Sequence, residues 1–180
     1  MEKKCVVITN PMIAANKSSQ VTLSKFLRVI SACYRQVSVI GGNVTVDADL
    51  EQINLISIPI QRSGNKLRRM LDILLLQLKM AVHTARNTDK HIPVYFWVAD
   101  KMLIPFWAAR LKKGDLRFFL YGNVMQEGRP SRFRQLSGQL IAYMANHADS
   151  ICVESPSVLR QWEPMVKPCK TRIIHLYTPS

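Results

Sequence analysis

The stretch that decides the fold is the last third of the chain. It reads DLRFFLYGN over residues 115–123, GQLIAYMANHADSICVESPSVLRQW over 138–162 and TRIIHLYTPS over 171–180. Apolar runs rich in β-branched and aromatic residues alternate there with segments of helical periodicity. This alternation predicts the order strand, loop, helix, strand, helix, strand. Such a βαβ pattern is typical of a parallel sheet that is covered by helices.

The same alternation continues back to the N-terminus. The runs CVVIT, VSVI, VYFWV and SICV are apolar throughout, which indicates central strands that are buried on both faces. We expect strands over residues 4–9, 37–40, 55–60, 94–98, 117–120, 150–153 and 172–176. The predicted fold class is α/β, a three-layer Rossmann-like domain whose mostly parallel sheet of about seven strands has helices on both faces.

Helices are expected between these strands, over residues 18–33, 66–86, 101–112 and 133–146, with a short one from Ser157. The second helix confines its polar residues to a narrow face, so most of it is expected to be buried. Gly114, after two lysines, suits the left-handed residue that ends the third helix. The irregular loop over 121–132 is expected at the carboxyl ends of the strands, where open α/β sheets bind ligands.

Composition limits the class of protein. With 180 residues and 48% hydrophobic residues, the chain suits one well-buried domain. Its 25 Lys and Arg against 12 Asp and Glu give a formal net charge of +13, which favours nucleic acid, an anionic bilayer or phosphorylated substrates as partners. The four cysteines form no C-x-x-C pair, so reduced thiols in the cytoplasm are expected. The most apolar helix is too short and too interrupted to span a bilayer, so membrane contact would be peripheral.

Basic residues gather in three clusters. The first begins a helix, where its cations oppose the helix dipole, and a bound diphosphate or anionic headgroup would explain them. A solvated basic face is the alternative interpretation. This cluster, the predicted anion or membrane-surface site, consists of Arg62, Lys66, Arg68 and Arg69; the others consist of Arg110, Lys112, Lys113 and Arg117, and of Arg129, Arg132 and Arg134.

Several chemistries lack their motifs. Phe118 and Phe119 are adjacent in a predicted buried strand and suit a core better than base stacking, so nucleic acid is disfavoured as a partner. No histidine has a metal partner at helical spacing, and no nucleophile elbow, Walker loop or dinucleotide fingerprint is found, so no metal or cofactor is predicted. Among the acids at expected strand ends, Asp100 suits a helix cap, whereas Glu154 and the neighbouring Ser155 suit either a cap or a cleft.

The segment ADSICVESPSVLRQW resembles the ADAVIVVSEALREWL segment of the N-terminal domain of retaining GT-B glycosyltransferases of the family-4 type. The agreeing positions are Ala148, Asp149, Val153, Ser155 and Leu159, with Trp162 near the equivalent aromatic end. The resemblance implies that an acceptor binds this domain. It also implies that a nucleotide-sugar, as substrate, binds mainly a second domain that is absent from this chain. A donor-contacting histidine of the family corresponds to Tyr121 here, and the family's Gly-Gly loop after the first strand is replaced by NPMIAANKSS.

These observations define the expected function. The chain is expected to be the acceptor-binding half of a glycosyltransferase that moves sugar to a glycolipid or polysaccharide, at the cytoplasmic face of the inner membrane, and to be inactive without a donor-binding domain or subunit. No catalytic residue is assigned. The expected site residues are Asn10 and Asn16 in the first loop, Tyr121, Asn123 and Arg132 in the late loop, and Glu154 and Ser155 at a strand exit. A stand-alone Rossmann-like module that binds a phosphorylated small molecule or nucleic acid, and a small complete enzyme, are the alternatives.

Overall fold

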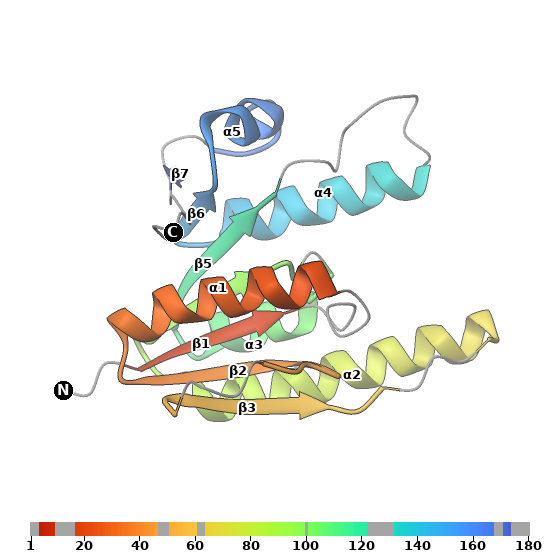
Figure 1. The fold of residues 1–180 in the computed structure, drawn as a ribbon. Coiled ribbons are helices and arrows are strands. Elements are labelled where there is room, and N and C mark those ends of the chain that lie inside the picture. The colour runs from red at the N-terminus through yellow and green to blue at the C-terminus, as the bar shows by residue number, and fades with distance from the viewer. Residues whose placement is uncertain are drawn as a thin grey trace.

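The computed structural model describes residues 4–9, 17–46, 51–60, 64–99, 101–121, 132–167 and 171–173. Its strands are β1 (Lys4–Thr9), β2 (Gln36–Gly42), β3 (Ile53–Ile58), β4 (Pro93–Trp97), β5 (Asp115–Leu120), β6 (Ser150–Val153) and β7 (Thr171–Ile173). They form one parallel sheet in the order β3-β2-β1-β4-β5-β6-β7 (Figure 1). The expected parallel α/β fold is confirmed, and the four continuously apolar runs lie on interior strands. Residues 174–176 of the last expected strand lie outside the described residues.

Five helices connect the described strands. They are α1 (Lys17–Cys33), α2 (Lys66–Asn87), α3 (Leu103–Leu111), α4 (Arg132–His147) and α5 (Pro156–Trp162). Residues of α1 form one core with the sheet face that carries Tyr95, Trp97 and Phe119. Residues of the other four helices form a second core on the opposite face, which carries Phe96 and Phe118. The adjacent Phe118 and Phe119 therefore fill different cores, as the alternation of side chains along a strand requires.

The end of α3 differs from the prediction. Lys113, with φ of 58°, is the left-handed residue, and its N–H donates to the Arg110 carbonyl while the Gly114 N–H donates to the Ala109 carbonyl. This pair of hydrogen bonds is a Schellman motif in which the left-handed position precedes the glycine. Gly114 is required for a different reason: a Cβ there would lie 2.7 Å from Thr88 Cγ2. The glycine thus allows close approach of the chain.

The prediction that most of α2 is buried is wrong. Its buried side chains, Leu76, Met80 and Thr84, begin only at the middle of the helix, and from Leu67 to Leu75 the side chains are exposed or partly exposed. A helix of this length spans about 33 Å, whereas the six- or seven-residue strands beneath it span about 20–23 Å. The first turns of α2 therefore project past the carboxyl edge of the sheet (Figure 1). Hydrophobicity alone cannot distinguish such an overhang from a core helix.

Cysteine exposure follows the fold. Cys5 and Cys152 are buried in interior strands as free thiols, and burial raises the pKa of Cys5 to about 12. Cys33, at the end of α1, is exposed. Among the described residues, no helix is long and apolar enough to cross a bilayer.

Candidate functional site

The candidate site lies at the carboxyl ends of the interior strands, on the face that α1 covers. Thr9 ends β1 beside Trp97, the last residue of β4, and the two strands meet where the strand order changes direction. Such a switch point is where open α/β sheets bind ligands. Thr9 is fully buried, and its Oγ1 has no hydrogen-bond partner within the described part of the chain. A buried hydroxyl of this kind is an unused donor and acceptor at the mouth of the sheet.

Gly41, near the end of β2, packs directly against Thr9 and so belongs to the same candidate site. A Cβ on Gly41 would lie 2.8 Å from Thr9 Cγ2 and 2.4 Å from Val44 Cγ2, so only glycine allows the chain to approach Thr9 so closely. The next residue but one, Asn43, adopts a φ of 47° and exchanges two side-chain hydrogen bonds with the backbone of Ile60, at 2.8 and 3.0 Å. These bonds hold together the segments that leave β2 and β3.

Val98, directly after β4, carries backbone strain at the same edge. Its φ of 48° lies in the left-handed region, which a β-branched side chain rarely adopts. Strain of this kind costs on the order of 1–3 kcal/mol and is concentrated at functional sites. The strained residue immediately follows Trp97 at the switch point.

Tyr121 and Glu154 directly follow two neighbouring strands, β5 and β6, at the carboxyl edge of the sheet. Phe119 pairs with Cys152 in the parallel ladder, and Tyr121 and Glu154 each follow two residues later, so side-chain alternation directs both toward the α1 side. The Tyr121 ring meets the Trp97 ring edge-on, with centroids 5.1 Å apart. Partial burial raises the pKa of the Glu154 carboxyl. A phenol can donate and accept hydrogen bonds, and a carboxylate can accept them from sugar hydroxyls.

The segment that carries the family resemblance is held by structural contacts. Ser155 caps α5: its Oγ accepts the Val158 N–H at 3.4 Å, so the helix begins at Pro156 and not from Ser157. Asp149 accepts the Leu116 N–H at 2.8 Å and so fixes the start of β5. The interpretation of Ser155 as a helix cap is therefore confirmed.

Trp162 ties the end of the same segment to the candidate site. It is buried, and its Nε1 donates to the Tyr121 carbonyl at 3.1 Å. The backbone of Tyr121 is thus held by α5, while its ring rests on Trp97 and Phe119 of the sheet.

The remaining expected site residues are placed less fully. Asn10, Asn16, Arg62 and Asn123 lie outside the described residues, as does Asp100. Arg132 and Lys66 each begin a helix, α4 and α2, at the carboxyl edge, and Arg68 and Arg69 are exposed on the projecting turn of α2. Sequence reasoning missed Thr9, Gly41 and Val98. The Gly-Gly pair that ends VSVIGG was the available signal for Gly41, whereas the φ of Val98 left no trace in the sequence.

One cluster of polar side chains lies nearer the amino ends of the strands. Arg117 donates to Asp115 at 2.6 and 2.9 Å and to the Tyr95 hydroxyl at 2.7 Å, and the Tyr34 hydroxyl lies 3.0 Å from that of Tyr95. Burial lowers the pKa of Arg117, but its bonds to Asp115 and its proximity to Tyr95 outweigh this and raise the value. Arg117 is therefore occupied by structural partners.

Two depressions that described residues line also lie at the amino edge. One, of about 540 Å³, is lined by residues including Arg35 and Glu51, and another, of about 430 Å³, by residues including His91 and Asp149. Neither reaches Thr9, Tyr121 or Glu154, and we favour the carboxyl edge because parallel sheets present their ligand-binding loops there. Among the described residues, no group of three His, Cys, Asp or Glu side chains could hold a metal ion.

Comparison with known proteins supports a glycosyltransferase-like fold. No family model matches the sequence, and no curated protein does so. Among solved structures, HepE (Alr3699) of Anabaena in complex with UDP is similar with a TM-score of 0.63 at 15% identity, and the match covers 97% of this chain and 44% of HepE. A glycosyltransferase of Rickettsia africae is similar with a TM-score of 0.54 at 13% identity, and this match covers 97% and 43%. The chain thus has the fold of one Rossmann-like half of GT-B glycosyltransferases and spans less than half the length of these two proteins.

Proposed function

We propose that this chain is the acceptor-binding half of a glycosyltransferase and that a second domain or subunit binds the nucleotide-sugar donor. The observation that carries the proposal is the coverage of the two structural matches. Almost all of this chain corresponds to less than half of HepE and to less than half of the Rickettsia glycosyltransferase. The family-4 resemblance of the segment from Ala148 to Trp162 supports the acceptor side. HepE was crystallised with UDP, which supports a nucleotide-sugar as the donor.

The chemistry of the mouth fits binding and orientation of an acceptor. Thr9 offers a buried hydroxyl, Tyr121 a phenol, and Glu154 a carboxyl whose pKa is raised by burial. Glu154 is partly exposed and can accept hydrogen bonds from acceptor hydroxyls directly. The buried hydroxyls of Thr9 and Tyr121 can do so only once an entering acceptor displaces the side chains that cover them, and together these groups would hold an acceptor hydroxyl toward the donor sugar. Stabilisation of the positive charge that develops on the donor sugar would come from the second half. We therefore expect no turnover by this chain alone, and we expect it to work at the cytoplasmic side of a membrane that contains a glycolipid acceptor.

The proposal can be tested by amide chemical-shift mapping of the chain with two probes, a panel of octyl glycosides below micellar concentration and UDP. We expect shifts at Thr9, Tyr121 and Glu154 with at least one glycoside and weaker or no shifts with UDP. Thr9→Val keeps the side-chain shape but removes the hydroxyl, and it should weaken glycoside binding about five- to tenfold, the worth of a hydrogen bond near 1 kcal/mol. Thr84→Val is the matched control, because its equally buried Oγ1 also lacks a partner but lies on α2.

Two results would contradict the proposal. UDP binding at this edge with an affinity above that of every glycoside would assign the chain to the donor side. Equal loss of binding in Thr9→Val and Thr84→Val would place the ligand elsewhere. Binding of nucleic acid in place of both probes would instead support a stand-alone module.

A further inference from the structure

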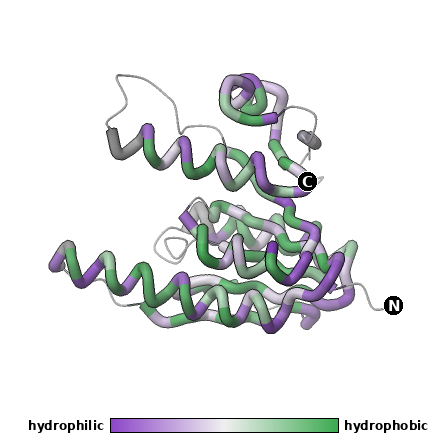
Figure 2. Tube along the Cα trace, turned by 180° about the vertical axis from the view of Figure 1, so that it is seen from behind, coloured by the Kyte–Doolittle hydropathy of each residue, from purple (hydrophilic) through white to green (hydrophobic). Residues whose placement is uncertain are grey.

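The large apolar side chains that are exposed among the described residues are distributed very unevenly. Only Val21 on α1 and Leu55 on β3 lie outside the layer formed by α2, α3 and α4, which covers one face of the sheet. That layer faces the viewer in Figure 2, where green segments follow α2 along its whole projecting length. The rest belong to α2 (Leu67, Met70, Leu71, Ile73, Leu74, Leu75, Leu78 and Val82), α3 (Trp107 and Leu111) and α4 (Leu136 and Tyr143).

On α2 these residues form a continuous stripe. Leu67, Leu71, Leu74, Leu78 and Val82 follow one another at intervals of three and four residues, so they lie on one face of the helix. Leu67 is 73% exposed and Leu71 59%. The buried side chains of α2, Leu76, Met80 and Thr84, project from nearly the opposite side of the helix, and Leu76 and Met80 belong to the core beneath the sheet. The helix therefore has two apolar faces, of which the described structure covers one.

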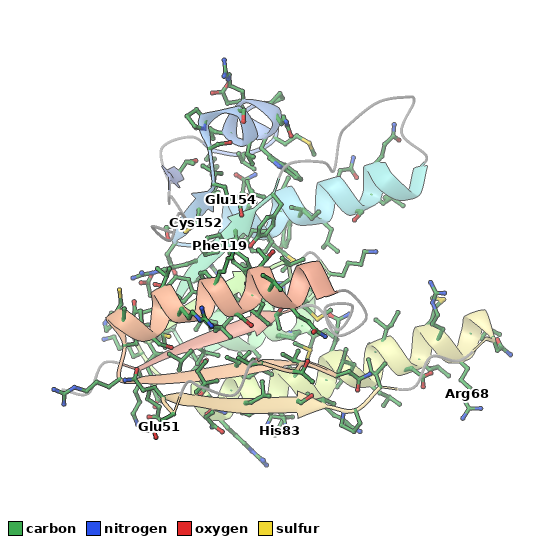
Figure 3. The ribbon with its side chains drawn as sticks, viewed as in Figure 1. Glu51, Arg68, His83, Phe119, Cys152 and Glu154 are labelled. Atoms are coloured by element: carbon green, nitrogen blue, oxygen red, sulfur yellow. The ribbon has the colours of Figure 1, made fainter. Side chains whose placement is uncertain are left out.

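Basic residues border this stripe. The residues beside the stripe, around the circumference of the helix, include Arg68, Lys79 and Arg86. The sole acidic residue of α2 is Asp72. The first turn carries Arg68 and Arg69 and no acid, although cations there oppose the helix dipole. Arg68 extends from the projecting end, away from the sheet (Figure 3). An apolar face bordered by cations is the pattern of helices that lie in a membrane interface.

We infer that α2 docks on an anionic bilayer surface, with the stripe from Leu67 to Val82 in the headgroup–acyl boundary. The basic residues that border the stripe, Arg68, Lys79 and Arg86, would then contact lipid phosphates. Charge selects this occupant over a second copy of the chain, because two molecules of net charge +13 repel each other. An acidic protein would satisfy the cations, but a bilayer supplies negative charge and a long apolar boundary together. The inference does not depend on the proposed transferase function, since it concerns only lipid binding.

The test is flotation of the whole chain with vesicles of phosphatidylcholine containing about 30% phosphatidylglycerol, compared with phosphatidylcholine alone. We expect binding to the anionic vesicles that weakens with added salt. The double substitution Leu71→Ser and Leu74→Ser should lower the partition coefficient at least tenfold, because it removes most of the apolar area of two stripe residues. Arg68→Gln should lower it about fivefold, the worth of one cation near an anionic surface.

The matched control is the double substitution Val21→Ser and Leu55→Ser, which removes exposed apolar side chains from other surfaces. It should bind anionic vesicles like the unmodified chain, and both double variants should keep the same circular dichroism spectrum. Failure of the unmodified chain to float, or equal binding by both double variants, would overturn the inference. Sedimentation equilibrium supplies a further check: a dimer that the Leu71 and Leu74 substitutions dissociate would make the stripe a self-association surface and also overturn it.

Discussion

Replacement of Gly41 by alanine should destabilise the domain, because the added methyl group has no space. The new Cβ would lie 2.4 Å from Val44 Cγ2 and 2.8 Å from Thr9 Cγ2, whereas carbon atoms in contact lie about 3.5–4.0 Å apart. Both neighbours are buried and β-branched, so neither can rotate away at low cost. More than 1 Å of movement must be absorbed by the end of β2 or by the segment that contains Val44.

The magnitude follows from two opposing terms. Overpacking of a close-packed core costs about 1–3 kcal/mol, and this overlap is at the upper end. Loss of backbone freedom in the unfolded chain returns about 0.4–1 kcal/mol when glycine becomes alanine. The expected net loss in free energy of unfolding is therefore about 2 kcal/mol, which lowers the Tm by about 4–8 °C for a domain of this size.

Urea denaturation followed by circular dichroism measures this loss. Gly64→Ala is the matched control, because nothing lies within 4 Å of its added Cβ and the residue is exposed, so its stability should stay within about 0.5 kcal/mol of the original. Val44→Ala removes the closest clashing methyl, so the double variant with Gly41→Ala should be more stable than the sum of the single effects by about 1 kcal/mol. A Gly41→Ala protein as stable as the Gly64→Ala control would refute the argument.

Three further outcomes are expected. Trp162→Phe removes the donor to the Tyr121 carbonyl and should cost about 1–2 kcal/mol in urea denaturation; an unchanged midpoint would mean that the bond contributes nothing. Burial raises the pKa of Glu154, so its ionisation opposes folding: Glu154→Gln should be the more stable protein at neutral pH, and the gap should close as pH falls through the raised pKa toward the ordinary value of 4.5. A gap that widens on acidification would contradict this cause. Iodoacetamide should modify the exposed Cys33 in the native protein while Cys5, buried and with a pKa of about 12, reacts only on unfolding, as peptide mass spectrometry can show.

The fold could be predicted because its signals are local and repeated. Each interior strand is a short apolar run, and a strand buried on both faces needs no polar side, so VYFWV and SICV indicate their own positions. The parallel pairing of all seven strands agrees with the predicted alternation of strands and helices. Helix ends were predicted to within a few residues, but the residue that ends α3 was not, because Lys113 and Gly114 divide between them two roles that a single glycine usually fills.

The candidate site was less predictable, since it depends on register and backbone angles. Tyr121 and Glu154 could be proposed from their positions at strand exits, but their shared direction toward the α1 side follows from the pairing of Phe119 with Cys152. The buried hydroxyl of Thr9 looks in sequence like the end of an ordinary apolar strand, and the φ of Val98 has no compositional signal. The exposure of α2 could not be predicted, because hydrophobic periodicity indicates that a helix has an apolar face but not whether another element covers that face.

The two proposals together constrain how an acceptor would reach the domain. The stripe on α2 faces away from the sheet, so a docked domain would hold its strands roughly along the membrane plane, with one helix layer, about 10–12 Å thick, between sheet and lipid. The first turns of α2 project past the edge where Thr9, Tyr121 and Glu154 lie (Figure 1). The candidate site at the carboxyl edge would then face along the membrane plane, at about one helix layer from the lipid. A glycolipid could present its sugar there only if its headgroup extends at least that thickness above the acyl chains, so acceptors with long headgroups should be preferred over simple monoglycosylated lipids.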